Sequence, residues 1–98
     1  MDVMIQAVSF TADRSLKDFV TEKVQKLSIF FDGIVSCEVY LKVDRKAAAN
    51  NKVSEIKINI PGKELFAKKQ CDSFEEATDL VTDALRRQLM KYKEKTLA

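Results

Sequence analysis

The sequence predicts an α+β fold with the element order β-α-β-β-β-α, in which a four-stranded sheet carries two helices on one face. Two stretches repeat apolar residues at the spacing of amphipathic helices. Between them, residues 35–44 and 52–60 alternate apolar and polar side chains, as half-buried strands do. Three consecutive strands joined by short connections favour an antiparallel meander, with the helices on one face and the other face open.

The first strand is predicted for residues 1–10, and the first helix follows it. Asp13 can cap this helix, because its side chain can accept a hydrogen bond from an unpaired N–H of the first turn. The helix is expected to run to about residue 30 or 31. Asp32-Gly33 is expected to end it, since glycine suits the left-handed conformation that follows many helices. The apolar stripe of this helix comprises Leu16, Phe19, Val20, Val24, Leu27, Phe30 and Phe31.

Residues 35–44 give the clearest strand, followed by a flexible connection over residues 45–51 and a third strand over residues 52–60. Pro61-Gly62 predicts a turn, and a fourth strand is expected over residues 64–71. Ser73 and Glu76 form a capping box that opens a long helix over residues 73–95. Its packing stripe is expected to be Phe74, Ala77, Val81, Ala84, Leu85, Gln88 and Tyr92.

A chain of 98 residues suits one domain, here taken as residues 1–98 without internal repeats. No run approaches the ~20 apolar residues of a membrane span, and Met1-Asp2 begins no signal peptide, so a cytoplasmic protein without membrane contact is expected. Cys37 and Cys71 fall at apolar positions of strands, which indicates buried thiols. The chain has no histidine, no Gly-rich phosphate loop and no CxxC motif. An enzyme, a metal site and a cofactor are therefore not expected, nor is a small-molecule substrate.

Charge is distributed unevenly along the chain. Residues 1–83 carry 12 Lys+Arg and 14 Asp+Glu, a net charge of −2, whereas residues 84–98 carry 5 Lys+Arg and one Glu, a net charge of +4. Acids near the start of a helix and bases near its end also complement the helix dipole. Dipole compensation needs only one or two cations, so five indicate a site for a polyanion.

Helical spacing separates these cations into two groups. Arg87, Lys91 and Lys95 recur at i, i+4 and i+8 along one margin of the packing stripe, while Arg86 and Lys93 lie on the other side. In the first helix, Lys23 and Lys26 are expected to emerge beside Phe19 and Phe30. If the helices lie side by side, Lys23 and Lys26 are predicted to continue the row of Arg87, Lys91 and Lys95. The alternative is that these cations are only solvated surface residues.

Two weaker candidate surfaces are present. The outward face of the sheet is expected to offer aromatic and basic side chains, as sheets that stack single-stranded bases do. Ordinary cross-strand pairing explains these residues equally well. They are Tyr40, Lys42, Lys57, Asn59, Phe66 and Lys68. The connection after the second strand adds Arg45, Lys46 and Lys52, which could reach a phosphate backbone.

Three segments resemble one known family. They are residues 27–34 (Leu-Ser-Ile-Phe-Phe-Asp-Gly-Ile), residues 71–77 (Cys-Asp-Ser-Phe-Glu-Glu-Ala) and residues 85–95 (Leu-Arg-Arg-Gln-Leu-Met-Lys-Tyr-Lys-Glu-Lys). These segments and the element order β-α-β-β-β-α together resemble those of the ribosome hibernation promoting factors. That family includes the ribosome-associated inhibitor A proteins and was formerly called the sigma-54 modulation proteins. The resemblance extends over nearly the whole chain and is to the short members.

The resemblance implies a bacterial, non-enzymatic translation regulator of stress and stationary phase. Such a protein would bind the 30S subunit between head and body, occupy the channel of mRNA and tRNA, contact 16S rRNA, and be a monomer off the ribosome. By the same resemblance the RNA-binding residues would be Lys23, Lys26, Arg86, Arg87, Lys91, Lys93 and Lys95. Two alternatives stay open. One is a general binder of structured RNA, since the β-β-β-α part has the layout of double-stranded-RNA-binding domains. The other is a transcription modulator that binds protein through its sheet edge.

Overall fold

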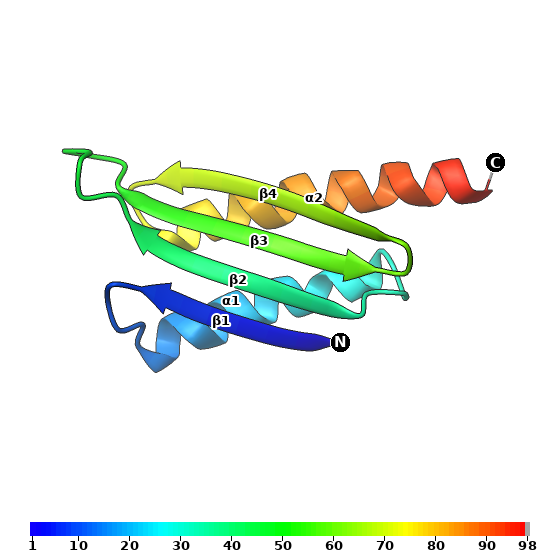
Figure 1. Ribbon diagram of the computed structural model, residues 1–98, viewed down its shortest axis with the longest axis horizontal. Helices are drawn as coiled ribbons and strands as arrows, with labels where there is room; N and C mark the ends of the chain where they lie inside the picture. Colours follow the sequence, from blue (N-terminus) through cyan, green and yellow to red (C-terminus); the bar gives the residue numbers. More distant parts are fainter. Residues whose placement is uncertain (98) are drawn as a thin grey trace.

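The computed structural model describes the backbone of residues 1–97 and the side chains of residues 1–95. Its elements follow the predicted order (Figure 1). They are β1 (Asp2–Val8), α1 (Arg14–Gln25), the 3₁₀ turn η1 (Lys26–Ile29), β2 (Ser36–Val43), β3 (Lys52–Ile60), β4 (Lys63–Cys71) and α2 (Phe74–Leu97). Both helices cover the same face of the sheet, and the other face is open, which confirms the predicted α+β architecture.

The four strands form one sheet in the order β1-β2-β3-β4. β1 pairs with β2 in parallel, and the β1-α1-β2 segment is therefore a crossover unit. β2, β3 and β4 form the predicted antiparallel meander, with Val39 opposite Ile56 and Ile56 opposite Ala67. This register places most apolar side chains of the three strands on the helix side, because side chains alternate between the two faces, whereas Val53 and Phe66 lie on the open face.

The core lies between the sheet and the two helices. Its fully buried residues include Val20 and Val24 of α1, Cys37, Val39 and Leu41 of β2, Ile56 and Ile58 of β3, and Val81, Leu85 and Leu89 of α2. Phe10 stacks on Phe74 with ring centroids 4.9 Å apart, so the segment after β1 is fixed against the start of α2. Both cysteines are buried free thiols, as predicted.

The two predicted N-terminal caps are present. The N–H of Leu16 donates to Asp13 Oδ1 at 2.8 Å, and the N–H of Glu76 donates to Ser73 Oγ at 3.1 Å. The buried face of α2 is broader than its sequence suggests. Leu89 and Thr78 are fully buried in addition to most of the predicted stripe. Thr78 is accommodated because its hydroxyl donates to Ser54 Oγ of β3 at 3.1 Å.

The end of the first helix differs from the prediction. Regular α-helix stops at Gln25, and the next four residues form the 3₁₀ turn η1. Gly33 does not take the left-handed conformation. Of the two glycines, Gly62 has a positive φ. A Cβ on Gly33 would lie 2.7 Å from Phe31 Cε1, so this glycine permits close approach of the Phe31 ring. Gly62, with φ of +77°, forms the predicted turn between β3 and β4.

Candidate nucleic-acid interface

α1 with η1 and α2 lie side by side and run in the same direction (Figure 1). Between them is a cleft of about 220 Å³, lined by basic, acidic and apolar side chains. Its cations are Lys23, Lys26 and Arg86, and its acids are Asp79 and Asp83. The structure thus brings three of the predicted RNA-binding residues together.

Each cation of this cleft is paired with a carboxylate. Lys23 Nζ lies 2.8 Å from Asp79 Oδ1, and Arg86 Nη2 lies 2.9 Å from Asp83 Oδ1. Lys26 Nζ lies 3.5 Å from Glu22 Oε1. An anion entering the cleft must therefore share these cations with acids already in contact with them, which reduces the net attraction.

Aromatic rings orient two of these cations, as the sequence predicts for Lys23. Lys23 Nζ lies 5.6 Å from the centroid of the Phe19 ring. The guanidinium carbon of Arg86 lies 5.7 Å from the centroid of the Phe30 ring. Cation–π contacts of this kind hold the charged group over the ring while part of it remains open to solvent. The charged groups are therefore positioned before any ligand arrives.

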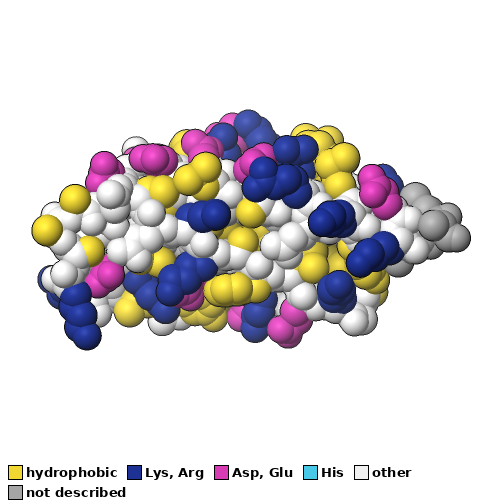
Figure 2. Space-filling model, turned by 90° about the horizontal axis from the view of Figure 1, so that it is seen from above, with side chains coloured by type: hydrophobic (Ala, Val, Ile, Leu, Met, Phe, Trp, Pro, Cys, Tyr) yellow, Lys and Arg dark blue, Asp and Glu magenta, His cyan; other side chains and the backbone are white. Residues whose placement is uncertain are grey.

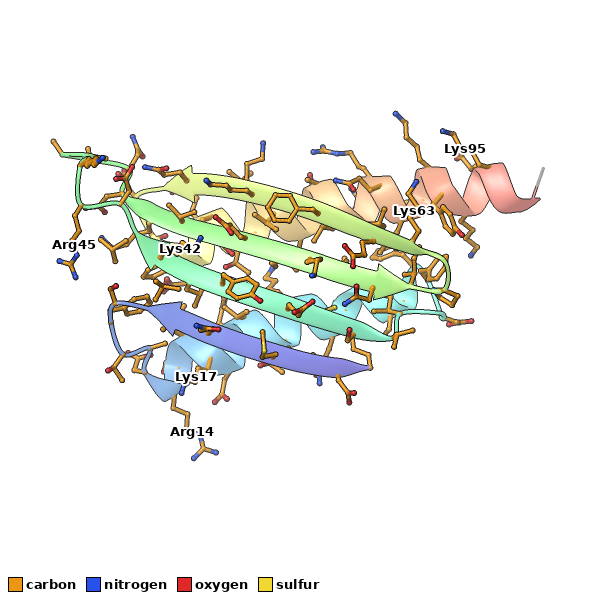
Figure 3. All side chains as sticks on the ribbon, viewed as in Figure 1. Arg14, Lys17, Lys42, Arg45, Lys63 and Lys95 are labelled. Carbon is orange, nitrogen blue, oxygen red and sulfur yellow. The ribbon has the colours of Figure 1, made fainter. Side chains whose placement is uncertain are left out.

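The opposite margin of α2 carries Arg87, Lys91 and Lys95 and faces the edge strand β4. Lys91 and Lys95 line a groove of about 160 Å³ together with Lys63 of β4. Lys63 and Lys95 lie near each other at one end of the molecule (Figure 3). Figure 2, which looks onto α2 and the β4 edge, shows Lys and Arg side chains spread over this face. Acidic side chains mostly follow its long borders.

The predicted grouping of the cations needs one correction. Arg86, not Arg87, adjoins Lys23 and Lys26, because α1 lies along the margin of α2 that carries Arg86. Asp83 contacts cations on both margins of α2. Besides its contact with Arg86, its Oδ2 lies 3.1 Å from Nη1 of Arg87. Lys93 lies on the Arg86 side, in a second cleft of about 310 Å³ lined by Ile29, Phe30, Met90 and Glu94. The seven cations therefore form two surfaces rather than one continuous row.

The outward face of the sheet is a network of paired charges. Lys57 Nζ lies 3.2 Å from Glu38 Oε2, and Glu55 Oε1 contacts both Lys42 Nζ at 3.1 Å and Lys68 Nζ at 3.6 Å. Hydrogen bonds from Asn59 and Lys57 hold the pKa of the Glu38 carboxyl below its usual value. Cross-strand pairing thus accounts for these lysines, and Phe66, 54% exposed, is the one aromatic side chain of the described residues that is exposed there.

Neither a metal site nor a reactive thiol is found among residues 1–97. No group of three or more His, Cys, Asp or Glu side chains is arranged to hold a metal ion in this part of the chain. Burial raises the pKa of the Cys37 thiol to about 11 and also raises the pKa of Cys71. Both thiols are therefore protonated near neutral pH, the unreactive form. In the described residues no helix is both long and apolar enough to cross a membrane.

Comparison with known proteins gives relatives over nearly the whole chain. The chain is 33% identical over 97 residues to the ribosome hibernation promoting factor of Azotobacter vinelandii, covering 99% of this chain and 87% of that protein. It is 35% identical over 95 residues to the ribosome hibernation promoting factor of Pseudomonas putida, covering 97% and 89%.

A solved structure shares the fold. It is that of a ribosomal subunit interface protein from Coxiella burnetii, with a TM-score of 0.86 at 19% identity, covering 96% of this chain and 99% of the other. Residues 3–97 match the family described as Sigma 54 modulation protein / S30EA ribosomal protein. The match spans both helices and every cation of the two basic surfaces. The chain belongs to the Sigma 54 modulation protein / S30EA ribosomal protein family.

Proposed function

We propose that this protein is a ribosome hibernation factor of the cytoplasm. It binds the small ribosomal subunit through 16S rRNA, occupies the channel used by mRNA and by the anticodon arms of tRNA, and keeps idle ribosomes inactive without catalysing a reaction. Relatives called ribosome hibernation promoting factors, matched over nearly their whole length, support this function. The observation that carries it in this chain is the concentration of cations along both margins of α2.

The shape of the molecule suits occlusion of a channel. It is an elongated body whose Cα atoms extend 46 × 23 × 19 Å, with α2 along its long axis (Figure 1). The helices are fixed to the sheet by a continuous core and by the stacked rings of Phe10 and Phe74. A rigid body loses little conformational entropy on binding. The same contacts therefore give it a more favourable binding free energy than they would give a flexible segment.

Electrostatic attraction to rRNA supplies much of the affinity in this proposal. If about five cations contact phosphates, log K should fall with log salt concentration at a slope of roughly −3.5 to −4.5. Between 50 and 200 mM salt, this slope predicts a loss of affinity of roughly 100- to 500-fold. The seven candidate contacts are Lys23, Lys26 and Arg86 of the cleft, Lys93 beside it, and Arg87, Lys91 and Lys95 toward β4.

The test is co-sedimentation of the protein with purified 30S subunits at 50 and 200 mM salt. We expect binding at low salt that weakens as predicted, and a strong loss in the charge-reversal variant Arg87→Glu/Lys91→Glu. A double variant that reverses two exposed cations at the far end of α1, Arg14→Glu/Lys17→Glu, is the matched control, because it changes the net charge equally. No co-sedimentation at either salt concentration would overturn the proposal.

Free duplex RNA added as competitor separates this function from general RNA binding. A hibernation factor should stay on the subunit when duplex RNA is present at equal phosphate concentration, because the channel adds shape complementarity to charge. Equal competition would assign the protein to the class of general structured-RNA binders instead. A transcription modulator that uses the sheet edge would be unaffected by Arg87→Glu/Lys91→Glu.

A further inference from the structure

Among the described residues, the groove between the start of β4 and the last turns of α2 is lined by lysines and by no carboxylate. Its lining within the described residues consists of Lys63, Leu65, Gln88, Lys91, Tyr92 and Lys95. The other basic cleft, between α1 and α2, is lined by Asp79 and Asp83 as well as by its cations. An anion in the β4–α2 groove thus meets three ammonium groups and, among the described lining residues, no competing acid.

The three lysines of this groove make no ion pair with the part of the chain that the structure describes. No ion pair joins Lys63, Lys91 or Lys95 to an acidic side chain of the described residues, in contrast to the paired Lys23 and Arg86. Like charges held around one space raise the local positive potential. A bound anion relieves this repulsion and adds its own attraction, so both effects favour binding at this place.

Lys63 is held in position by an aromatic ring. Its Nζ lies 5.4 Å from the centroid of the Tyr92 ring, and that ring is in turn tilted against Phe31, with centroids 5.9 Å apart. An ammonium group on a ring face keeps N–H donors directed away from the ring. Lys63 can therefore donate to an anion without losing its contact with Tyr92.

The width of the groove is fixed by a link between its two walls. Gln88 of α2 donates a hydrogen bond from Nε2 to the backbone oxygen of Phe66 in β4 at 3.1 Å. Leu65 is buried beneath the groove, and Lys63 lies opposite Ile60 across the turn. The walls are therefore set by the fold, and binding need not order a flexible loop.

We propose that this groove binds a phosphodiester group of RNA and that Lys63 is a phosphate-binding residue of the ribosome contact. The inference rests on the proposed function and extends the contact surface from α2 onto the edge strand β4. A single phosphate carries one negative charge and several acceptor oxygens, which three ammonium groups around about 160 Å³ can satisfy together. The cations that continue this contact along α2 are Lys91 and Lys95.

The experiment measures the affinity of three variants for 30S subunits over a range of salt concentrations. We expect Lys63→Gln to make the slope of log K against log salt shallower by about 0.7 to 0.9, because one phosphate contact is lost. In 0.1 M salt this corresponds to binding weakened by roughly 5- to 8-fold. Lys63→Arg should retain the slope. Lys17→Gln, which removes an exposed lysine at the other end of the molecule (Figure 3), should also retain it.

The possible outcomes separate this inference from the function on which it rests. If the unaltered protein binds 30S subunits and Lys63→Gln binds with the same slope and affinity, the inference is overturned while the proposed function stands. If Lys17→Gln weakens binding as much as Lys63→Gln, the effect is one of net charge and the groove is not a site. Absence of binding by the unaltered protein would overturn the proposed function and this inference with it.

Discussion

The carboxylate of Asp83 contacts Arg86 and Arg87 at the same time and so neutralises part of both basic surfaces of α2. The hydrogen bond from Arg86 holds the pKa of the Asp83 carboxyl below its usual value, and the charge of Arg87 lowers it further. Asp83 is therefore ionised at neutral pH. The variant Asp83→Asn removes this charge while keeping the size of the side chain, and we expect it to bind the ribosome more tightly.

The magnitude follows from the distances. A phosphate in contact with Arg86 or Arg87 would lie roughly 7 Å from the Asp83 carboxylate, where repulsion between unit charges near water is about 0.5–1 kcal/mol. Removing the Asp83 charge should therefore tighten binding to the ribosome roughly two- to fivefold. The loss of two partly exposed ion pairs should destabilise the fold only slightly, because exposed ion pairs contribute little to stability. The thermal midpoint of a domain of this size then falls by roughly 4–8 °C per kcal/mol, which leaves the protein folded at 25 °C.

The assay is a titration of 30S subunits with fluorescently labelled protein at fixed salt concentration. Glu75→Gln is the matched control, because it removes one negative charge from the first turn of α2, far from both arginines. We expect tighter binding for Asp83→Asn and little change for Glu75→Gln. Weaker binding of Asp83→Asn would contradict this expectation, because it would mean that Asp83 positions the arginines for RNA rather than competing with RNA for them.

Three further changes test the fold. Thr78→Val leaves the buried hydroxyl of Ser54 without its partner, which should cost about 1–3 kcal/mol in urea unfolding, and the double variant Ser54→Ala/Thr78→Val should recover most of it. Gly62→Ala forces φ of +77° on alanine and should lower the unfolding free energy by about 1–2 kcal/mol. Because the folded-state pKa of Cys37 is raised from 9.0 to about 11, stability should fall between pH 9 and 11, by roughly 2–3 kcal/mol in total, and less in Cys37→Ala.

The sequence predicts the order of the elements and the antiparallel meander of β2, β3 and β4, but not the parallel pairing of β1 with β2. Strict alternation over residues 35–44 specifies that Cys37, Val39 and Leu41 face the core, because a register slip of one residue would turn them all outward. Val35, in the same phase, precedes β2 and is 57% exposed. Local pattern did not predict the end of α1, because Leu27 and Phe30 continue the helical spacing through the 3₁₀ turn. Burial of Thr78 was also missed, since its partner Ser54 comes from another element and has no local signal.

The basic surfaces were predicted in part. Helical spacing alone divided the cations of α2 into two margins, and that division is present in the structure. Which margin adjoins α1 depends on tertiary packing. Helical spacing therefore predicts Arg87 beside Lys23 and Lys26, where the structure has Arg86. Lys63 was missed because it begins a strand directly after a turn, and only the packing of β4 against α2 brings it to Lys91 and Lys95. The partner of Lys23 is equally remote, since Asp79 belongs to the other helix.

On the proposed function, the protein and the ligands of the decoding channel exclude each other on the small subunit. The most direct measurement loads 30S subunits with a labelled short mRNA and a labelled anticodon stem-loop, and then adds the protein in increasing amounts. We expect both ligands to be released as the protein binds, and excess ligand to displace the protein. Protein that binds at full occupancy while both ligands remain on the subunit would contradict it.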